Sequence, residues 1–154
     1  MNLHLENKVT LITGSSAGIG FAIAAGFAAE GARVIVNGRS EKRVDSAISA
    51  ILEQSPNAKL ESLVADLATA EAAKQTVARF PAVDILVNNL GVYAPKSFED
   101  LTDEDWSEII ETNFLSGVRL SRQYLPKMKK ANWGRILDAY FSSRASRRST
   151  FPQR

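Results

Sequence analysis

The sequence of 154 residues contains no cysteine, which excludes disulfide bonds, thiolate nucleophiles and cysteine-ligated metals. Its one histidine, His4, has no second ligand near it in the sequence and gives no indication of a metal site. Every apolar run is well short of the roughly 18 residues of a membrane span. The first residues show no basic segment followed by an apolar stretch. We therefore expect no bound metal, no membrane partner, no export signal and a cytoplasmic location.

Positive charge is scarce outside the last residues of the chain. The formal net charge is +2, and residues 138–154 contribute +3 through four arginines and one aspartate, which leaves the first 137 residues at −1. Three lysines at 127–130 are typical of the solvated last turn of a helix, where cations favour the helix dipole. Because nucleic-acid surfaces are rich in clustered cations, we expect no nucleic-acid partner.

Short apolar runs alternate with segments of helical periodicity along the chain. Helical spacing or a threonine at a helix start marks residues 44–52, 69–80 and 102–110, and another helical stretch extends from Asn113 to about Lys130. This alternation predicts one α/β domain over residues 1–137, a Rossmann-like, doubly wound parallel sheet. The runs are rich in valine, isoleucine and leucine, are typical of buried parallel strands, and lie at residues 8–13, 32–37, 60–65, 83–89 and 134–139.

A glycine-rich segment, "TGSSAGIG" at 13–20, follows the first predicted strand and opens a helix. Gly14 allows a tight turn, Gly18 allows backbone amides to approach a pyrophosphate, and Gly20 allows the helix to pack closely on the strand. The helix N-terminus supplies favourable electrostatics for an anion. This segment predicts a dinucleotide-binding loop.

Several further motifs occur in a fixed order after this loop. "DL" at Asp66 and Leu67 follows the third predicted strand, and "NNLG" at 88–91 follows the fourth. Asn113 lies in "ETNFLSG" at the junction of two helical stretches, and "GRIL" at 134–137 opens the fifth strand. From about Lys8 to Leu137, the sequence resembles the short-chain dehydrogenase/reductase family.

The resemblance implies a sheet of strand order 3-2-1-4-5 and hydride transfer between a nicotinamide cofactor and a small carbonyl or alcohol substrate. It also implies association into a homo-oligomer. Asn113 matches the asparagine of the family's catalytic set, and either Ser142 or Ser143 matches its serine. The residues assigned to cofactor binding are Gly14, Ser15, Ser16, Gly18, Ile19, Gly20, Arg39, Asp66, Leu67, Asn88 and Gly91.

Three of these polar residues also have a purely structural interpretation. Asp66 is suited to capping the next helix, and Asn88 to bracing the sheet through hydrogen bonds from its side chain to the backbone. Asn113 is equally consistent with a polar residue that interrupts a helix. These alternatives stay open at the level of the sequence.

The choice between the two nicotinamide dinucleotides depends on the end of the second strand. Sites for NAD usually place an acid there to bind the ribose 2′-hydroxyl, whereas sites for NADP place a cation near the 2′-phosphate. Here Gly38 replaces the acid and Arg39 follows it, which favours NADP. Ala17 counts against this choice, because many NADP-preferring relatives carry a second cation there, so NAD stays as the alternative.

The family's Y-x-x-x-K pattern is absent from these 154 residues. Tyr140 and Arg144 are the nearest match to this pattern. If they continue the strand, four residues at about 3.3 Å each would separate them by roughly 13 Å, which is too far for the two side chains to act together. We interpret the Ser/Arg-rich tail, 138–154, as the product of a frameshift, an altered transcript or a cloning remnant. The chain is then an oxidoreductase with an incomplete catalytic set or, alternatively, a catalytically silent dinucleotide-binding or interaction module.

Overall fold

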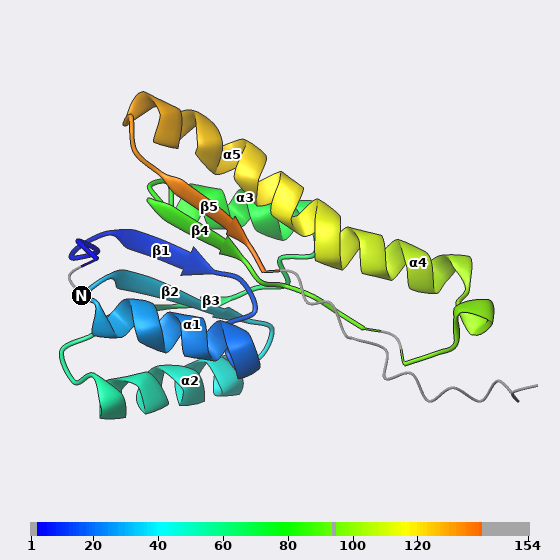
Figure 1. Ribbon diagram of the computed structural model, residues 1–154, viewed down its shortest axis with the longest axis horizontal. Coiled ribbons are helices and arrows are strands. Elements are labelled where there is room, and N and C mark those ends of the chain that lie inside the picture. The colour runs from blue at the N-terminus through cyan, green and yellow to red at the C-terminus, as the bar shows by residue number, and fades with distance from the viewer. Residues whose placement is uncertain (1–2, 94, 140–154) are drawn as a thin grey trace, which may run out of the picture.

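The computed structural model describes residues 3–93 and 95–139. Within these ranges the chain forms a five-stranded parallel sheet, and its strand order, 3-2-1-4-5, is the one that the family resemblance implies (Figure 1). The strands are β1 (Val9–Ile12), β2 (Arg33–Gly38), β3 (Lys59–Val64), β4 (Ile85–Asn88) and β5 (Arg135–Asp138). The helical elements are α1 (Gly18–Ala29), α2 (Glu41–Gln54), α3 (Ala70–Arg79), the short η1 (Phe98–Asp100), α4 (Asp103–Ile110), the π-helical turn η2 (Glu111–Leu115) and α5 (Ser116–Lys130).

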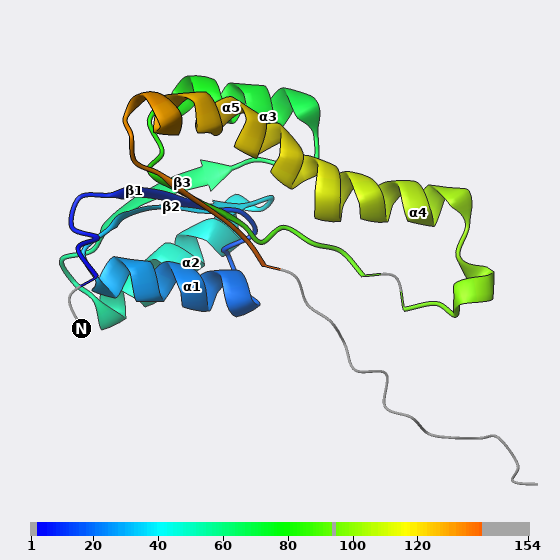
Figure 2. The ribbon, with the colours of Figure 1, turned by 45° about the horizontal axis from the view of Figure 1, so that its top comes forward.

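Helices cover both faces of the sheet (Figure 2). Alternate residues of a strand point to opposite faces, so Leu11 and Ile35 pack towards α3 and α5, whereas Ile12 and Val34 pack towards α1 and α2. All four side chains are fully buried. The strands are apolar on both faces because each face is covered by helices, which is why they read as continuous apolar runs in the sequence.

The helical stretch from α4 to α5 extends beyond the sheet (Figures 1 and 2). It begins with a capping box, in which Thr102 accepts from the Asp105 amide and Asp105 accepts from the Thr102 amide. It ends at Lys130 with three lysines in the last turn, as the sequence predicts. In the described part of the chain, no helix combines the length and the apolar character needed to cross a membrane.

The fifth strand is an edge strand of the described sheet and is not buried, in contrast to what its apolar run alone indicates. Among the described residues, β5 pairs with β4 alone, and its Leu137 side chain is 47% exposed. Short apolar sequence alone does not distinguish an edge strand from a central one, because the pattern of residues is the same and only the number of neighbouring strands differs.

A buried tyrosine joins α5 to the chain segment that follows α3. The Tyr124 hydroxyl donates to the Phe80 carbonyl oxygen over 3.1 Å, and the side chain is fully buried. Burial raises the pKa of Tyr124 above its ordinary value of 10. The protonated hydroxyl therefore stabilises the folded state fully below about pH 10, and this contribution is lost as the pH rises further.

We expect Tyr124→Phe to lower the free energy of unfolding by about 1–2 kcal/mol at pH 7, because the Phe80 carbonyl loses its donor. The variant should also lose less stability than the parent between about pH 10 and 12, since the buried ionisable group is gone. Urea unfolding at several pH values measures both effects. Tyr93→Phe is the matched control, because the Tyr93 ring is 82% exposed. Equal alkaline sensitivity of the parent and Tyr124→Phe would contradict this account.

Candidate functional site

The loop between β1 and α1 has the backbone geometry that its glycines predict. Gly14 and Gly18 have φ values of +62° and +58°, which favour glycine. A Cβ atom at Gly20 would lie 2.5 Å from both the Gly14 carbonyl oxygen and the Asn89 Nδ2 atom. Gly20 therefore allows α1 to begin directly against β1 and β4.

The N-terminus of α1 suits an anion. Ala17 occupies the N-cap position without a side-chain cap, and the first turn, which lies wholly among the described residues, carries no acidic residue. A Cβ atom at Gly18 would meet no described atom within 4 Å. First-turn amides lack acceptors within their own helix, so this open backbone fits the pyrophosphate of a dinucleotide.

A buried asparagine at the end of β2 holds this loop in place. The Gly14 amide donates to Asn37 Oδ1 over 3.0 Å, and Asn37 Nδ2 donates to the carbonyl oxygens of Leu63 and Ala65, each over 3.1 Å. Ser15 completes the connection, because its amide donates to the Asn37 carbonyl oxygen and its hydroxyl accepts from the Asn37 amide, both over 2.8 Å. The loop, β2 and the end of β3 therefore form one unit.

A second set of hydrogen bonds joins the loop to the segment after β4. The Thr13 hydroxyl oxygen accepts from the amides of Asn89 and Leu90 over 2.8 and 2.9 Å. Asn89 Nδ2 donates to the carbonyl oxygens of Thr13 and Gly14. Asn89, and not Asn88, is thus the residue that braces the sheet from its side chain to the backbone.

Asn88 makes a different set of contacts from the one its structural interpretation predicts. Its Nδ2 donates to Ser121 Oγ over 3.1 Å and to Asp138 Oδ1 over 2.9 Å. Its Oδ1 is buried and has no hydrogen-bond partner among the described residues. These atoms border a pocket of about 280 Å³ between β4, β5 and α5, which Asn113 also lines.

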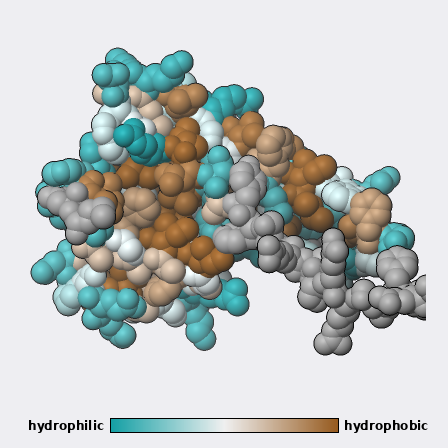
Figure 3. Space-filling model, viewed as in Figure 1, coloured by the Kyte–Doolittle hydropathy of each residue, from teal (hydrophilic) through white to brown (hydrophobic). Residues whose placement is uncertain are grey.

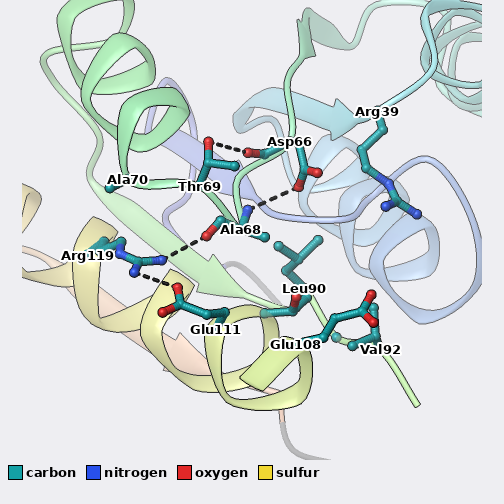
Figure 4. Close-up of a pocket in the computed structure, with 12 residues that line it drawn as sticks. Arg39, Asp66, Ala68, Thr69, Ala70, Leu90, Val92, Glu108, Glu111 and Arg119 are labelled. Carbon is teal, nitrogen blue, oxygen red and sulfur yellow. Dashed lines mark hydrogen bonds and ion pairs between the residues drawn. The ribbon is translucent and has the colours of Figure 1, made fainter. Parts of the chain in front are cut away.

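A larger pocket of about 390 Å³ lies beyond the ends of β2, β3 and β4 (Figure 4). Arg39 and Asp66 enter it from the ends of β2 and β3. Asp66 Oδ1 accepts from the Ala68 amide, but the N-cap of α3 is Thr69, so Asp66 is not the helix cap. Arg39 forms no ion pair or hydrogen bond with any residue that the structure describes, which leaves its guanidinium group available to a ligand.

Arg119 closes the pocket from α5. Its guanidinium group donates to the Ala68 carbonyl oxygen over 2.7 Å and to Glu111 Oε2 over 2.6 Å (Figure 4). This pair of contacts ties the start of α5 to the segment after β3. Arg119 is therefore engaged with protein groups, unlike Arg39.

Asn113 lies in η2, the π-helical turn, at the junction that the sequence predicts. Its Oδ1 accepts from the Val92 amide over 2.7 Å, and its Nδ2 donates to the Val92 carbonyl oxygen over 2.9 Å. π-Helical turns are rare and frequently occur at functional sites. Here the turn presents an asparagine that holds the segment after β4 beside the pocket.

The remaining assigned residues differ in what they can offer. The side chains of Ser15 and Leu67 are fully buried, and Ser15 Oγ donates to the Ile12 carbonyl oxygen, so any ligand contact from either residue would come from the backbone. Ser16 in the loop is half-buried, Ile19 at the start of α1 is exposed, and exposed Gly91 lines the larger pocket. Ser142, Ser143 and the Tyr140–Arg144 pair lie outside the described residues.

Sequence reasoning missed several residues that build the site, notably Thr13, Asn37, Asn89 and Arg119. The sequence does contain a signal for Asn37, since an asparagine in an otherwise apolar central strand must find hydrogen-bond partners. The sequence contains no such signal for Arg119, because its hydrogen-bond partners are 8 and 51 residues away in the chain. The described residues contain no group of three or more metal-ligating side chains close enough to hold a metal ion.

The fold and this loop define a Rossmann-like α/β protein. Comparison with a profile of the family described as "short chain dehydrogenase" gives a match over residues 8–151. The chain belongs to the short-chain dehydrogenase/reductase family.

Two curated relatives and one solved structure illustrate the similarity. The chain is 44% identical to the uncharacterized oxidoreductase YvaG of Bacillus subtilis over 89% of its length. It is 40% identical to the 3-oxoacyl-[acyl-carrier-protein] reductase FabG of Escherichia coli over 88% of its length. It spans about half of these relatives, 52% and 55% respectively. The L-sorbose reductase of Gluconobacter frateurii, in complex with NADPH and L-sorbose, superposes with a TM-score of 0.80 at 34% identity, over 90% of this chain and 54% of that one.

The hydrogen bonds of Asn37 lead to a prediction about stability. Asn37→Leu keeps the approximate size of the side chain but removes the acceptor of the Gly14 amide and a donor to two carbonyl oxygens, so we expect a loss of about 2–3 kcal/mol in the free energy of unfolding. Chemical denaturation measures this loss. Asn57→Leu, at an exposed position, should change stability by less than about 0.5 kcal/mol. Equal effects of the two substitutions would show that the Asn37 contacts contribute nothing.

Proposed function

We propose that this chain binds a nicotinamide dinucleotide and provides part of the active site of an oxidoreductase acting on a small carbonyl or alcohol. The observation that carries the proposal is the open α1 N-terminus, fixed by Asn37 and Asn89 beside a pocket that Arg39 and Asp66 enter. A bound nicotinamide would supply or accept the hydride. The names of similar proteins, an L-sorbose reductase in complex with NADPH and a 3-oxoacyl reductase, support this class of reaction.

In this proposal each part of the site has a distinct task. Backbone amides of residues 14–20 bind the pyrophosphate at the helix N-terminus. Asp66 and the backbone of Leu67 contact the adenine, while Asn88 and Gly91 lie beside the ribose next to the nicotinamide. Asn113 acts by holding the backbone of Val92 at this edge of the sheet.

We propose NADP(H) as the preferred cofactor, with NAD(H) as the weaker ligand. Arg39 follows β2 directly, is exposed, and pairs with no carboxylate in the described ranges. A planar guanidinium group binds phosphate oxygens through two parallel hydrogen bonds. The 2′-phosphate of NADP(H) is the group that would satisfy it.

Substitution of Arg39 tests this preference. We expect NADPH to bind more tightly than NADH to the parent chain, and Arg39→Asp to reverse the order because a carboxylate repels the 2′-phosphate and accepts from a 2′-hydroxyl. Calorimetric titration with both cofactors measures the order. Arg79→Asp, the same charge change at the exposed end of α3, should leave the order unchanged. Equal affinities of the parent for the two cofactors would refute the role of Arg39.

We further propose that the 154-residue chain turns over slowly even with cofactor bound. Hydride transfer to a carbonyl develops negative charge on the oxygen, which must receive a proton. The sequence contains no Y-x-x-x-K to provide a tyrosine with a neighbouring lysine. This same feature favours the second candidate function, a catalytically silent dinucleotide-binding module.

Turnover separates the two candidates. Loss of general acid catalysis reduces rates by about 10²- to 10⁴-fold, so we expect NADPH to bind with almost no oxidation in the presence of ketones and aldehydes. Appending a Y-x-x-x-K segment from a relative after the fifth strand should restore oxidation if the chain is part of an oxidoreductase. Turnover by the unaltered chain of about 1 per second, a common enzyme rate, would contradict this expectation. If Tyr140→Phe then abolished that turnover, Tyr140 would be the proton donor.

Association into a homo-oligomer is also a proposal. Apolar surface gathers near the middle of one face, where β5 lies, and along α5 and α4 (Figure 3). Exposed apolar side chains follow helical spacing on this stretch at Ile110, Phe114, Val118 and Leu125. A second copy of the chain carries the same row of apolar side chains, so pairing of the two copies would cover both rows.

Sedimentation velocity tests this association. We expect the parent chain to sediment as an oligomer or larger aggregate, and Leu125→Lys to shift the distribution towards monomer because a charge replaces an apolar contact. Leu52→Lys, at a comparably exposed leucine on α2, is the matched control and should leave the distribution unchanged. A parent chain that sediments as a monomer and melts cooperatively would contradict the proposal.

A further inference from the structure

Gly38 ends β2 at the position where NAD-binding sites carry an acid. Its φ is not in the positive range, unlike those of the described glycines Gly14, Gly18 and Gly31, so the backbone alone does not demand glycine here. Space does. A Cβ atom at position 38 would lie 2.8 Å from Ser16 Oγ, 2.9 Å from Ser16 Cβ and 3.0 Å from Val44 Cγ2. Real Cβ atoms essentially never show contacts as short as the two with Ser16, so a side chain at 38 requires Ser16 to move.

Ser16 is held in place, and Val44 need give by only a few tenths of an ångström. Ser16 follows Ser15, whose amide and hydroxyl both bond to the backbone of Asn37, so the loop is held against β2. Val44 is fully buried in the core between α1, α2 and the sheet. Rotation of the Ser16 hydroxyl would relieve the contact with Oγ but would leave the Cβ in place.

We infer that Ser16 is a specificity-determining residue, whose side chain excludes a side chain at position 38 and so excludes recognition of the NAD ribose by an acid. This inference rests on the proposed function, since it concerns the same cofactor site. An acid at this position binds the 2′-hydroxyl of NAD from the end of the second strand. The structure blocks that arrangement sterically, in addition to offering Arg39 to a phosphate.

The steric conflict at position 38 limits how the cofactor preference can be changed by substitution. Introducing an acid at position 38 alone places a carboxylate in a space already filled by Ser16, so the acid cannot reach its bonding position. Removing the Ser16 side chain frees two of the three close contacts and leaves the one with Val44 Cγ2 at 3.0 Å, which a small adjustment relieves. Ser16→Gly and Gly38→Asp should therefore act together.

The experiment combines Gly38→Ala and Gly38→Asp with three states of position 16. These states are the parent serine, Ser16→Ala and Ser16→Gly. Ser16→Ala is the matched control, because it removes the hydroxyl but keeps the Cβ atom that would lie 2.9 Å from the new side chain. Thermal melting without cofactor reports the steric conflict, and calorimetric titration with NADH and NADPH reports specificity.

We expect Gly38→Ala to lower the melting temperature by about 5 °C with serine or alanine at position 16, and by clearly less with glycine. We expect Gly38→Asp alone to leave NADH affinity unimproved, and the same change with Ser16→Gly to raise it about tenfold. An unchanged melting temperature for Gly38→Ala would overturn the steric conflict. An equal gain in NADH affinity for Gly38→Asp with and without Ser16→Gly would overturn the specificity role.

The two arms also separate this inference from the proposed function. A parent chain that binds neither NADH nor NADPH would refute the proposed cofactor site, while the melting experiment would still decide whether Ser16 excludes a side chain at 38. Recovery by Ser16→Ala equal to that by Ser16→Gly would show that the hydroxyl, and not the Cβ atom, causes the conflict. That result would overturn the steric role inferred for the Ser16 Cβ atom, which the loop backbone holds in place.

Discussion

The buried side chain of Asn37 is the interaction on which the rest of the site depends. It accepts from the glycine loop and donates to the chain at the end of β3, so a single amide group fixes two segments that carry the pocket. A carboxylate could not make both sets of bonds, since it has no donor, and an apolar side chain could make neither. The amide satisfies its own polar atoms while it satisfies those of the backbone.

The parallel arrangement of the strands determines where these contacts lead. All five described strands end at the same edge of the sheet, so the segments that follow β1, β2, β3 and β4 meet there. Thr13 and Asn89 join two of these segments directly, and Arg119 reaches a third from α5. The pocket lies at this edge because crevices beyond the carboxyl ends of strands are where open α/β sheets leave room for ligands.

Some glycines of the site are tightly packed and others face open space. Gly20 and Gly38 are crowded, so each allows two parts of the protein to approach, whereas Gly18 faces open space with a backbone that favours glycine. These three glycines therefore have two different physical reasons. The crowded pair sets the shape of the site, and the open one leaves the helix N-terminus accessible to an anion.

The sequence by itself determined the α/β fold, the glycine loop and the position of Asn113 at a helical junction, because these depend on local periodicity and on residues close together in the chain. Strand order came from resemblance to a family. Only the tertiary structure decided that Asn89 braces the sheet instead of Asn88, that β5 is half exposed, and that Ser16 crowds Gly38. The physical reason is that hydrogen-bond partners and close contacts between distant segments depend on side-chain direction and register, which a one-dimensional pattern does not contain.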